Sequence, residues 1–208
     1  MRICCIDPGI TNFAISVEEF DEKRIPTFTG KRYGKKRLAT PDFELFLYEH
    51  VYGNGRLVFF AKENISPDKG AFNSDMITTR IKLTEFLQSI RNILDTCDAF
   101  FCERQLKRNP YAQQVEFHCY SYFSWIYGNT RVISDVSASE KYFYLGCEKN
   151  LPKNVRKKWA VDVCLDILRK RGDEENIHSL KRNKKKLDDI ADTVIICQAL
   201  KVKIFTKG

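Results

Sequence analysis

The chain opens with two short apolar runs separated by a polar turn. Residues 3–6 and 13–17 are rich in β-branched, aromatic and small side chains, a pattern typical of buried strands. Gly9 lies in the turn between them, where glycine allows a positive φ and the close approach of another group. A third apolar run follows at residues 56–62. The three runs predict an antiparallel meander at the start of the fold.

Helical periodicity begins after this meander. Apolar residues recur at roughly helical spacing over residues 74–97, and an apolar run ending in Glu103 follows. A helix between two strands is typical of a β-α-β unit, so we expect the strand ending at Glu103 to lie parallel to the first strand. Residues 111–127 are apolar nearly all round a predicted helix. Such a helix is deeply buried, or packs on two sides with a subunit interface on one of them.

The last third of the chain continues the alternation of strands and helices. We predict a strand at residues 131–136, a helix from residue 153 to Gly172, and a last helix at residues 187–200. Residues 173–183 are polar and are expected to be mobile. No linker divides the chain, so we expect one α/β domain over residues 1–208, with a mixed five-stranded sheet flanked by helices.

Composition and charge favour a globular protein with an anionic partner. Hydrophobic residues make up 43% of the 208 residues, and the formal net charge is +8. The commonest partner of such a chain is nucleic acid. Residues 21–55 do not have a core pattern and are interpreted as a basic insertion, in which Tyr33 is suited to stacking on a base. A solvated surface loop is the alternative interpretation.

The cysteines indicate a reducing environment. The chain has eight of them, and none forms a C-x-x-C pair. This argues against a zinc site and against a disulfide framework, whereas free thiols in apolar runs suit a reducing compartment. No run approaches the ~20 apolar residues of a membrane span, and no signal-peptide pattern precedes the first strand. We therefore expect an intracellular protein without a membrane partner.

Four acidic residues stand at the ends of predicted elements. Asp7 and Glu103 each end a core strand, and Asp189 and Asp192 share one side of the last helix in its first turns. Three or four carboxylates are what two Mg²⁺ or Mn²⁺ ions about 4 Å apart require. The alternative is that these acids cap turns and oppose the helix dipole. Asp188 remains a candidate ligand, cap or outer acid.

The order of these motifs resembles that of the RuvC-type Holliday junction resolvases. The stretch Ile6-Asp7-Pro8-Gly9 is similar to the family's first motif. Glu103-Arg104-Gln105 with Arg108 resembles the branch found in poxviruses, other large DNA viruses and fungal mitochondria. Residues 184–192 are similar to the lysine-led Asp-Asp-x-x-Asp ending of that branch. The resemblance runs from residue 1 to about residue 200 and implies a ribonuclease H-like fold.

The resemblance also implies an activity and a site. It implies a homodimeric, metal-dependent endonuclease that cuts four-way or branched DNA symmetrically, during recombination or the processing of replication intermediates. Asp7, Glu103, Asp189 and Asp192 match the family's metal ligands, for two Mg²⁺ ions per site with Mn²⁺ as the alternative. Lys141 falls at the place of a family lysine near the attacked phosphate. The compartments implied are a cytoplasmic viral replication site, the nucleus or the mitochondrial matrix.

Basic residues flank the acidic motifs in the sequence, and phosphate contacts are their expected role. The candidates are Lys31, Arg32, Lys35, Lys36, Arg104, Lys107, Arg108, Lys184 and Lys185. Two other functions stay open: a different ribonuclease H-like nuclease of the RNA-processing or transposase type, and an inactive nucleic-acid-binding protein with this fold. The Asp-x-Gly hairpin also opens sugar kinases and actin-like ATPases, but those need a second glycine-rich phosphate loop and a longer chain.

Overall fold

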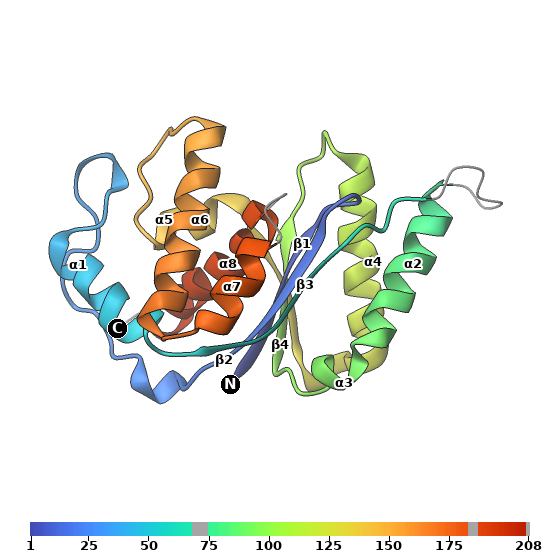
Figure 1. Ribbon diagram of the computed structural model, residues 1–208, viewed down its shortest axis with the longest axis horizontal. Coiled ribbons are helices and arrows are strands. Elements are labelled where there is room, and N and C mark those ends of the chain that lie inside the picture. The colour runs from blue at the N-terminus through green and yellow to red at the C-terminus, as the bar shows by residue number, and fades with distance from the viewer. Residues whose placement is uncertain (68–74, 183–186, 207–208) are drawn as a thin grey trace.

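A mixed five-stranded sheet forms the centre of the molecule (Figure 1). The computed structural model describes residues 1–67, 75–182 and 187–206. The strands are β1 (Arg2–Pro8), β2 (Phe13–Glu19), β3 (Arg56–Glu63), β4 (Ala99–Arg104) and β5 (Val132–Ser137), in the order β3-β2-β1-β4-β5. The pairs β1–β2 and β2–β3 are antiparallel, and β1–β4 and β4–β5 are parallel. The predicted meander and the predicted parallel pair are both confirmed.

Helices cover both faces of the sheet and complete an α/β fold, as predicted (Figure 1). One face carries α2 (Asp75–Ser89), α3 (Arg91–Leu94) and α4 (Pro110–Tyr127). The other carries α1 (Pro41–Phe46), α5 (Ala138–Tyr144), α6 (Lys153–Lys170), α7 (Glu174–Arg182) and α8 (Leu187–Phe205). Side chains alternate along β1, so Cys4 and Ile6 belong to the core under α2 and α4. Ile3 and Cys5 belong to the core under α8.

Helix α8, which carries two of the candidate site residues, is buried over most of its length. Its side chains from Ile190 to Val202 are buried except at Asp192, because it packs on β1 and β2 and against α5 and α6. A helix buried on all sides needs apolar residues all round, which its sequence supplies after the first turn. The polar first turn therefore lies at the end of this buried stretch, next to the sheet.

Residues 21–55 fold against the core, so the prediction that they lack core residues is wrong. Phe43 and Val51 are fully buried in the core on the α8 face. They come from α1 and from the π-helical stretch Leu47–Tyr52 that follows it. Short 3-10 turns at Glu22–Arg24 and Lys35–Arg37 complete the segment. Such short, irregular elements leave no regular strand or helix period in the sequence.

Tyr33 belongs to this packing and is not a free stacking platform. Its ring centroid lies 5.5 Å from that of Phe43 and 5.0 Å from that of Phe143. Its hydroxyl donates a hydrogen bond of 3.3 Å to the carbonyl of Tyr144. The prediction that Tyr33 stacks on a base is therefore replaced by a role in attaching the segment to α5.

The prediction of a mobile segment at residues 173–183 is also wrong for the residues that the structure describes there. Glu174–Arg182 form α7, and Ile177 and Leu180 are buried. The side chain of Asp173 accepts a hydrogen bond from the backbone of Asn176, which caps the helix. Two apolar residues three apart are enough to dock a short helix, although they do not stand out in a polar stretch.

None of the helices in the described part of the chain is long and apolar enough to cross a membrane. The eight cysteines are all free and buried, which agrees with their positions in apolar runs.

Candidate active site

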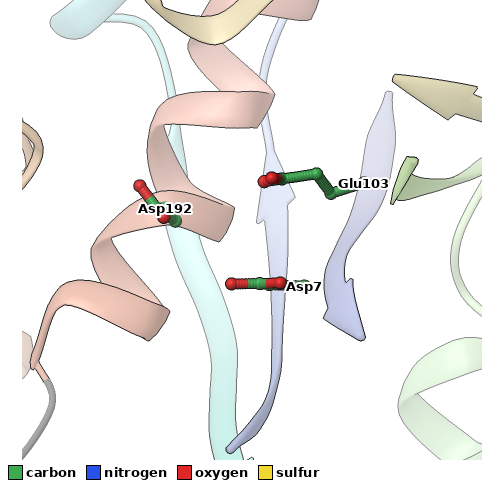
Figure 2. Close-up of side chains that lie close together, drawn as sticks. All are labelled: Asp7, Glu103 and Asp192. Atoms are coloured by element: carbon green, nitrogen blue, oxygen red, sulfur yellow. The ribbon is translucent and has the colours of Figure 1, made fainter. Parts of the chain in front are cut away.

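Two acidic side chains meet where neighbouring parallel strands end. The register of β1 and β4 pairs Ile6 with Cys102, so Asp7 and Glu103 directly follow paired residues on the same edge of the sheet. Helix α8 brings Asp192 to this edge, and Figure 2 shows the three side chains close together. One carboxylate oxygen of each residue lies within 4.8 Å of those of the other two. We call Asp7, Glu103 and Asp192 the three-acid group.

The donor set of the three-acid group fits a hard divalent cation. All three residues offer carboxylate oxygens, which Mg²⁺ and Mn²⁺ prefer. Oδ1 of Asp192 is buried and has no hydrogen-bond partner among the residues that the structure describes. A buried carboxylate oxygen without a donor is costly, and a bound cation would remove that cost.

Lys141 from α5 is the positive charge that faces the three-acid group. Its side chain is 2% exposed, and its Nζ lies 2.6 Å from Oε2 of Glu103 and 2.9 Å from Oδ2 of Asp192. Burial opposes the charge on Lys141, but the Glu103 and Asp192 carboxylates outweigh it and raise the pKa of this lysine above its ordinary value. Lys141 is therefore a fixed cation at neutral pH.

The carboxyl groups are under electrostatic strain. Burial, reinforced by the Glu103 carboxylate, raises the pKa of Asp7 well above its ordinary value. Burial also raises the pKa of Asp192, although the nearby Lys141 opposes the shift. Desolvation and like charges are the two general causes of such shifts in carboxyl groups. A divalent cation would favour the ionised forms and relieve this strain.

We expect Asp7→Asn to stabilise the protein in chelator at pH 7. The pKa of Asp7 is higher in the folded protein than its ordinary value of 3.8, so folding favours the protonated carboxyl group. This stabilisation is complete below pH 3.8 and is lost as the pH rises through the folded-state pKa. Asparagine carries no charge to desolvate, so the variant should have a higher free energy of unfolding than wild type in chelator. Thermal unfolding in EDTA and in Mg²⁺ measures this, with Asp188→Asn as control. A lower Tm for Asp7→Asn than for wild type in EDTA would contradict it.

The two other acids of α8 take different positions. The charge of Asp189 contributes to the raised pKa of Asp7, but its carboxylate is not part of the three-acid group. Asp188 forms an ion pair with Lys157 of α6. Of the roles left open for Asp188, the structure therefore favours that of an outer acid, which ties α8 to α6.

The predicted DNA-binding cations differ in how far they are already paired. Arg104 forms an ion pair with Asp135, and Lys36 lies 2.9 Å from Glu148. Arg32 donates a hydrogen bond to the carbonyl of Thr206. Lys31, Lys35, Lys107 and Arg108 are exposed, and so are the ion-paired Lys36 and Arg104. Lys184 and Lys185 lie outside the described residues.

Glu116 of α4 is a functional candidate that the sequence analysis missed. It is 4% exposed, and its Oε2 accepts a hydrogen bond of 2.8 Å from the backbone N–H of Gln105. Its Oε1 accepts one of 3.1 Å from the hydroxyl of Tyr120. Gln105 follows Glu103 by two residues, so Glu116 holds the strand end that carries a member of the three-acid group. The sequence feature that could have indicated this residue is an acidic side chain inside the otherwise apolar helix predicted at residues 111–127.

The chain is similar in sequence to a protein of an iridescent virus. No family model matches the chain. Uncharacterized protein 170L of Invertebrate iridescent virus 6 is 27% identical over 226 residues, which cover 96% of this chain and 88% of that protein.

Solved structures of Holliday junction resolvases share the architecture at low sequence identity. Fowlpox virus resolvase in complex with its substrate Holliday junction DNA aligns with a TM-score of 0.62 and 16% identity, covering 98% of this chain and 99% of its own. The yeast mitochondrial Holliday junction resolvase aligns with 0.54 and 15%, covering 96% and 78%. Thermus thermophilus RuvC aligns with 0.51 and 15%, covering 97% and 94%. The chain therefore has the fold of the RuvC-type Holliday junction resolvases, as its motifs predicted.

Proposed function

We propose that this protein is a metal-dependent endonuclease that resolves four-way DNA junctions by symmetric cleavage. The observation that carries the proposal is the convergence of Asp7, Glu103 and Asp192 with Lys141 at one edge of the sheet. The fold is shared with resolvases of a poxvirus, yeast mitochondria and a bacterium, and one of those structures contains Holliday junction DNA. The net charge of +8 supports a nucleic-acid substrate.

The chemistry proposed is hydrolysis of a phosphodiester bond. Asp7, Glu103, Asp189 and Asp192 would hold two Mg²⁺ ions, with Mn²⁺ as the alternative. Bound ions of this kind supply an activated water and neutralise charge on the leaving oxygen. Lys141 pairs with the carboxylates of Glu103 and Asp192. In the proposed mechanism it would orient these carboxylates and present a fixed positive charge to a bound phosphate.

The test of this function is cleavage of three labelled substrates in Mg²⁺: a four-way junction, a matched duplex and an RNA/DNA hybrid. We expect paired, symmetric cuts in the junction and little cutting of the other two. Equal cutting of duplex and junction would contradict the resolvase function. Preferred cutting of the hybrid would favour an RNA-processing nuclease, and tight binding without any cutting would favour an inactive nucleic-acid-binding protein.

We also propose a homodimer, because symmetric cleavage requires two active sites. The outer face of α2 and α4 carries large apolar side chains that are unusually exposed: Ile77 (47%), Ile81 (43%), Phe117 (58%) and Trp125 (88%). Between the two helices lies a cavity of about 320 Å³ lined in part by Ile77, Ile81 and His118. An apolar face of this kind is typical of a protein–protein interface.

We expect Trp125→Ser to weaken this dimer by about tenfold or more, because exposed tryptophans are frequent interface hot spots. Sedimentation velocity over a range of protein concentrations measures the effect. Leu45→Ser on α1 is the matched control, since Leu45 is 62% exposed on the opposite layer. A wild-type protein that is monomeric at micromolar concentration would contradict the dimer, and an unchanged Trp125→Ser dimer would exclude this face.

Exposed cations after β4 are the proposed phosphate contacts next to the three-acid group. Lys107 and Arg108 are exposed in the loop that follows Glu103. We expect the double variant Lys107→Ala/Arg108→Ala to reduce the magnitude of the slope of log association constant against log salt concentration by about 2. Each phosphate contact contributes about 0.9 to that slope. Fluorescence anisotropy with a labelled junction at several salt concentrations measures the slope.

The matched control replaces two exposed cations at the other end of β1. Lys23 and Arg24 are exposed in the 3-10 turn Glu22–Arg24. This turn follows Phe20, whose backbone is hydrogen-bonded to that of Met1 at the amino end of β1. Asp7 lies at the carboxyl end of the same strand, so Lys23→Ala/Arg24→Ala removes equal charge far from the three-acid group. A slope that falls equally in both double variants would mean that charge acts without a defined contact.

We propose a reducing compartment as the place of action. All eight cysteines are free and buried, and none is paired. A cytoplasmic viral replication site, the nucleus and the mitochondrial matrix all meet this condition.

A further inference from the structure

An open cavity of about 530 Å³ lies between the 21–55 segment, the α5–α6 loop and α6. The helices α1, α5 and α6, which surround it, lie on the same side of the sheet (Figure 1). No member of the three-acid group lines this cavity. Its volume is in the range of roughly 300–1,000 Å³ that is typical of small-molecule sites. The cavity is therefore a candidate ligand site separate from the proposed active site.

Most of the cavity wall is apolar or aromatic. Tyr48, Tyr52 and Trp159 supply aromatic rings. The aliphatic side chains of the wall are Leu38, Leu47, Leu145, Leu151 and Val163. Leu38 is 46% exposed and Tyr48 is 44% exposed, so part of this apolar surface is open to solvent. A ligand with an apolar body would cover it.

One ring of the wall already holds a cation. Nζ of Lys170 lies 4.0 Å from the centroid of the Tyr48 ring. Lys170 also pairs with Glu49 at 2.9 Å, so the two residues together are neutral. Aromatic faces attract ammonium groups through the quadrupole of the ring. The wall is thus suited to an organic cation as well as to an apolar group.

The charged groups of the cavity leave an excess of negative charge. The wall includes the carboxylates of Glu44, Glu148 and Asp166 and the guanidinium of Arg169. Arg169 pairs with Asp166 at 2.6 Å, and Lys36 pairs with Glu148 at 2.9 Å. The charge of Glu44 is left without a counter-charge in the described part of the chain. The cavity therefore attracts a monovalent cation and repels a phosphate, although the whole chain has a net charge of +8.

Two of these carboxylates act on the same part of the wall. Burial raises the pKa of the Tyr52 hydroxyl, and the charges of Glu44 and Asp166 raise it further. Glu44 belongs to α1 and Asp166 belongs to α6. A cation bound near the Tyr52 hydroxyl would therefore interact with carboxylates from two helices at once.

Contacts between backbone segments hold the cavity open in advance. Gly146, which lines it, has a φ of 72°, and a Cβ at this position would lie 2.6 Å from Cβ of Ala39. Glycine is the residue that accepts both this backbone angle and this close approach. The N–H of Lys149 donates a hydrogen bond of 2.9 Å to the carbonyl of Lys36. The α5–α6 loop is thus fixed against the 21–55 segment, and a preformed site costs less to fill.

We propose that this cavity binds a small organic cation, namely a monovalent amine with an apolar body, whose ammonium group lies near the carboxylates of Glu44 and Asp166. The inference adds a ligand site to the molecule and does not depend on the proposed nuclease function.

The experiment compares three probes that share one apolar body and differ in charge: 4-phenylbutylamine, 4-phenylbutanol and 4-phenylbutyrate. Calorimetry with the wild-type protein measures the affinities, in saturating Mg²⁺ so that the amine is kept from the three-acid group. The chain has two tryptophans, so the fluorescence of Trp159 in a Trp125→Phe background reports binding inside this cavity. We expect the amine to bind about tenfold more tightly than the alcohol, and the acid to bind most weakly.

Two double variants test the source of the charge preference. Glu44→Gln/Asp166→Asn should reduce the preference for the amine over the alcohol to about twofold or less, since it removes both carboxylates near Tyr52. The matched control is Asp42→Asn/Asp162→Asn, because these acids are exposed on the same two helices and do not line the cavity. It should keep the wild-type preference.

A further variant tests the location of the site. Val163→Phe places a larger side chain in the cavity wall and should weaken the binding of all three probes. Circular dichroism checks that each variant is folded. If Val163→Phe does not fold, the fluorescence change of Trp159 still decides where the amine binds.

Several outcomes would overturn the inference. They are no binding of the amine, equal affinities for amine and alcohol, binding without a change in Trp159 fluorescence, and an unchanged preference in Glu44→Gln/Asp166→Asn. Tighter binding of a blocked phenylalanine–lysine dipeptide than of the amine would replace the small-molecule site by a peptide site. Junction cleavage by a protein that binds no amine would overturn the inference and leave the proposed function intact.

Discussion

Replacing Asp192 by asparagine is expected to lower the rate of junction cleavage by about 10³-fold or more, equivalent to roughly 4 kcal/mol of lost transition-state stabilisation. The residue supplies one of three converging carboxylates, and its Oδ2 also pairs with Lys141 at 2.9 Å. Asparagine keeps the shape but removes the charge that a divalent ion requires. Single-turnover cleavage of a labelled junction in saturating Mg²⁺ measures the loss.

Asp188→Asn is the matched control for this experiment. Asp188 stands in the same first turns of α8 but pairs with Lys157 outside the three-acid group. We expect it to cleave within about threefold of wild type, since a partly exposed ion pair is worth only ~1 kcal/mol or less. Asp192→Asn activity within tenfold of wild type would rule out the proposed metal site. Equal losses in both variants would point to damage to α8 instead.

The convergence of Asp7 and Glu103 was predictable from the sequence. Each ends an apolar run, and the helix between the runs implied a parallel pair whose carboxyl ends meet. The roles of Asp189 and Asp192 were not equally predictable. Their three-residue spacing places them on one side of a helix, but the rotation of α8 about its axis depends on packing against the sheet. The structure places only Asp192 in the three-acid group.

Other features depend on contacts between distant parts of the chain. The position of Lys141 near the site was expected, but its ion pairs with Glu103 and Asp192 follow from α5, which the sequence did not predict. Residues 21–55 bury Phe43 and Val51 through short irregular elements that have no regular period. Tertiary packing stabilises such segments, and their local pattern does not reveal it.

Glu18 is the clearest case of a residue whose importance appears only in three dimensions. It lies on β2 with a side chain that is 1% exposed. Arg171 donates to its Oε1 at 2.8 Å, Lys201 pairs with the same oxygen, and Gln198 donates to Oε2 at 2.7 Å. Lys201 also donates to the carbonyl of Asn54 at 2.6 Å. This buried cluster therefore joins the sheet, α8 and the 21–55 segment.

We expect Glu18→Ala to lower the free energy of unfolding by about 3–5 kcal/mol, because it leaves Arg171 and Lys201 buried without a counter-charge. Urea denaturation at pH 7 measures the loss. The neighbouring Glu19 provides the control: it is 39% exposed and pairs with Arg2 and Arg56 at the surface. Glu19→Ala should cost about 1 kcal/mol or less. Similar losses in the two variants would contradict a special role for the buried cluster.

The same cluster predicts how stability depends on pH. Burial alone would raise the pKa of Glu18, but Arg171 and Lys201 outweigh it and lower this pKa from 4.5 to about 2. A depressed folded-state pKa contributes stability that is present above pH 4.5 and is lost as the pH falls toward 2. The shift corresponds to about 3 kcal/mol. The stability difference between wild type and Glu18→Gln should therefore shrink between pH 5 and about pH 2, and a constant difference over that window would show that Glu18 is not ionised in the folded protein.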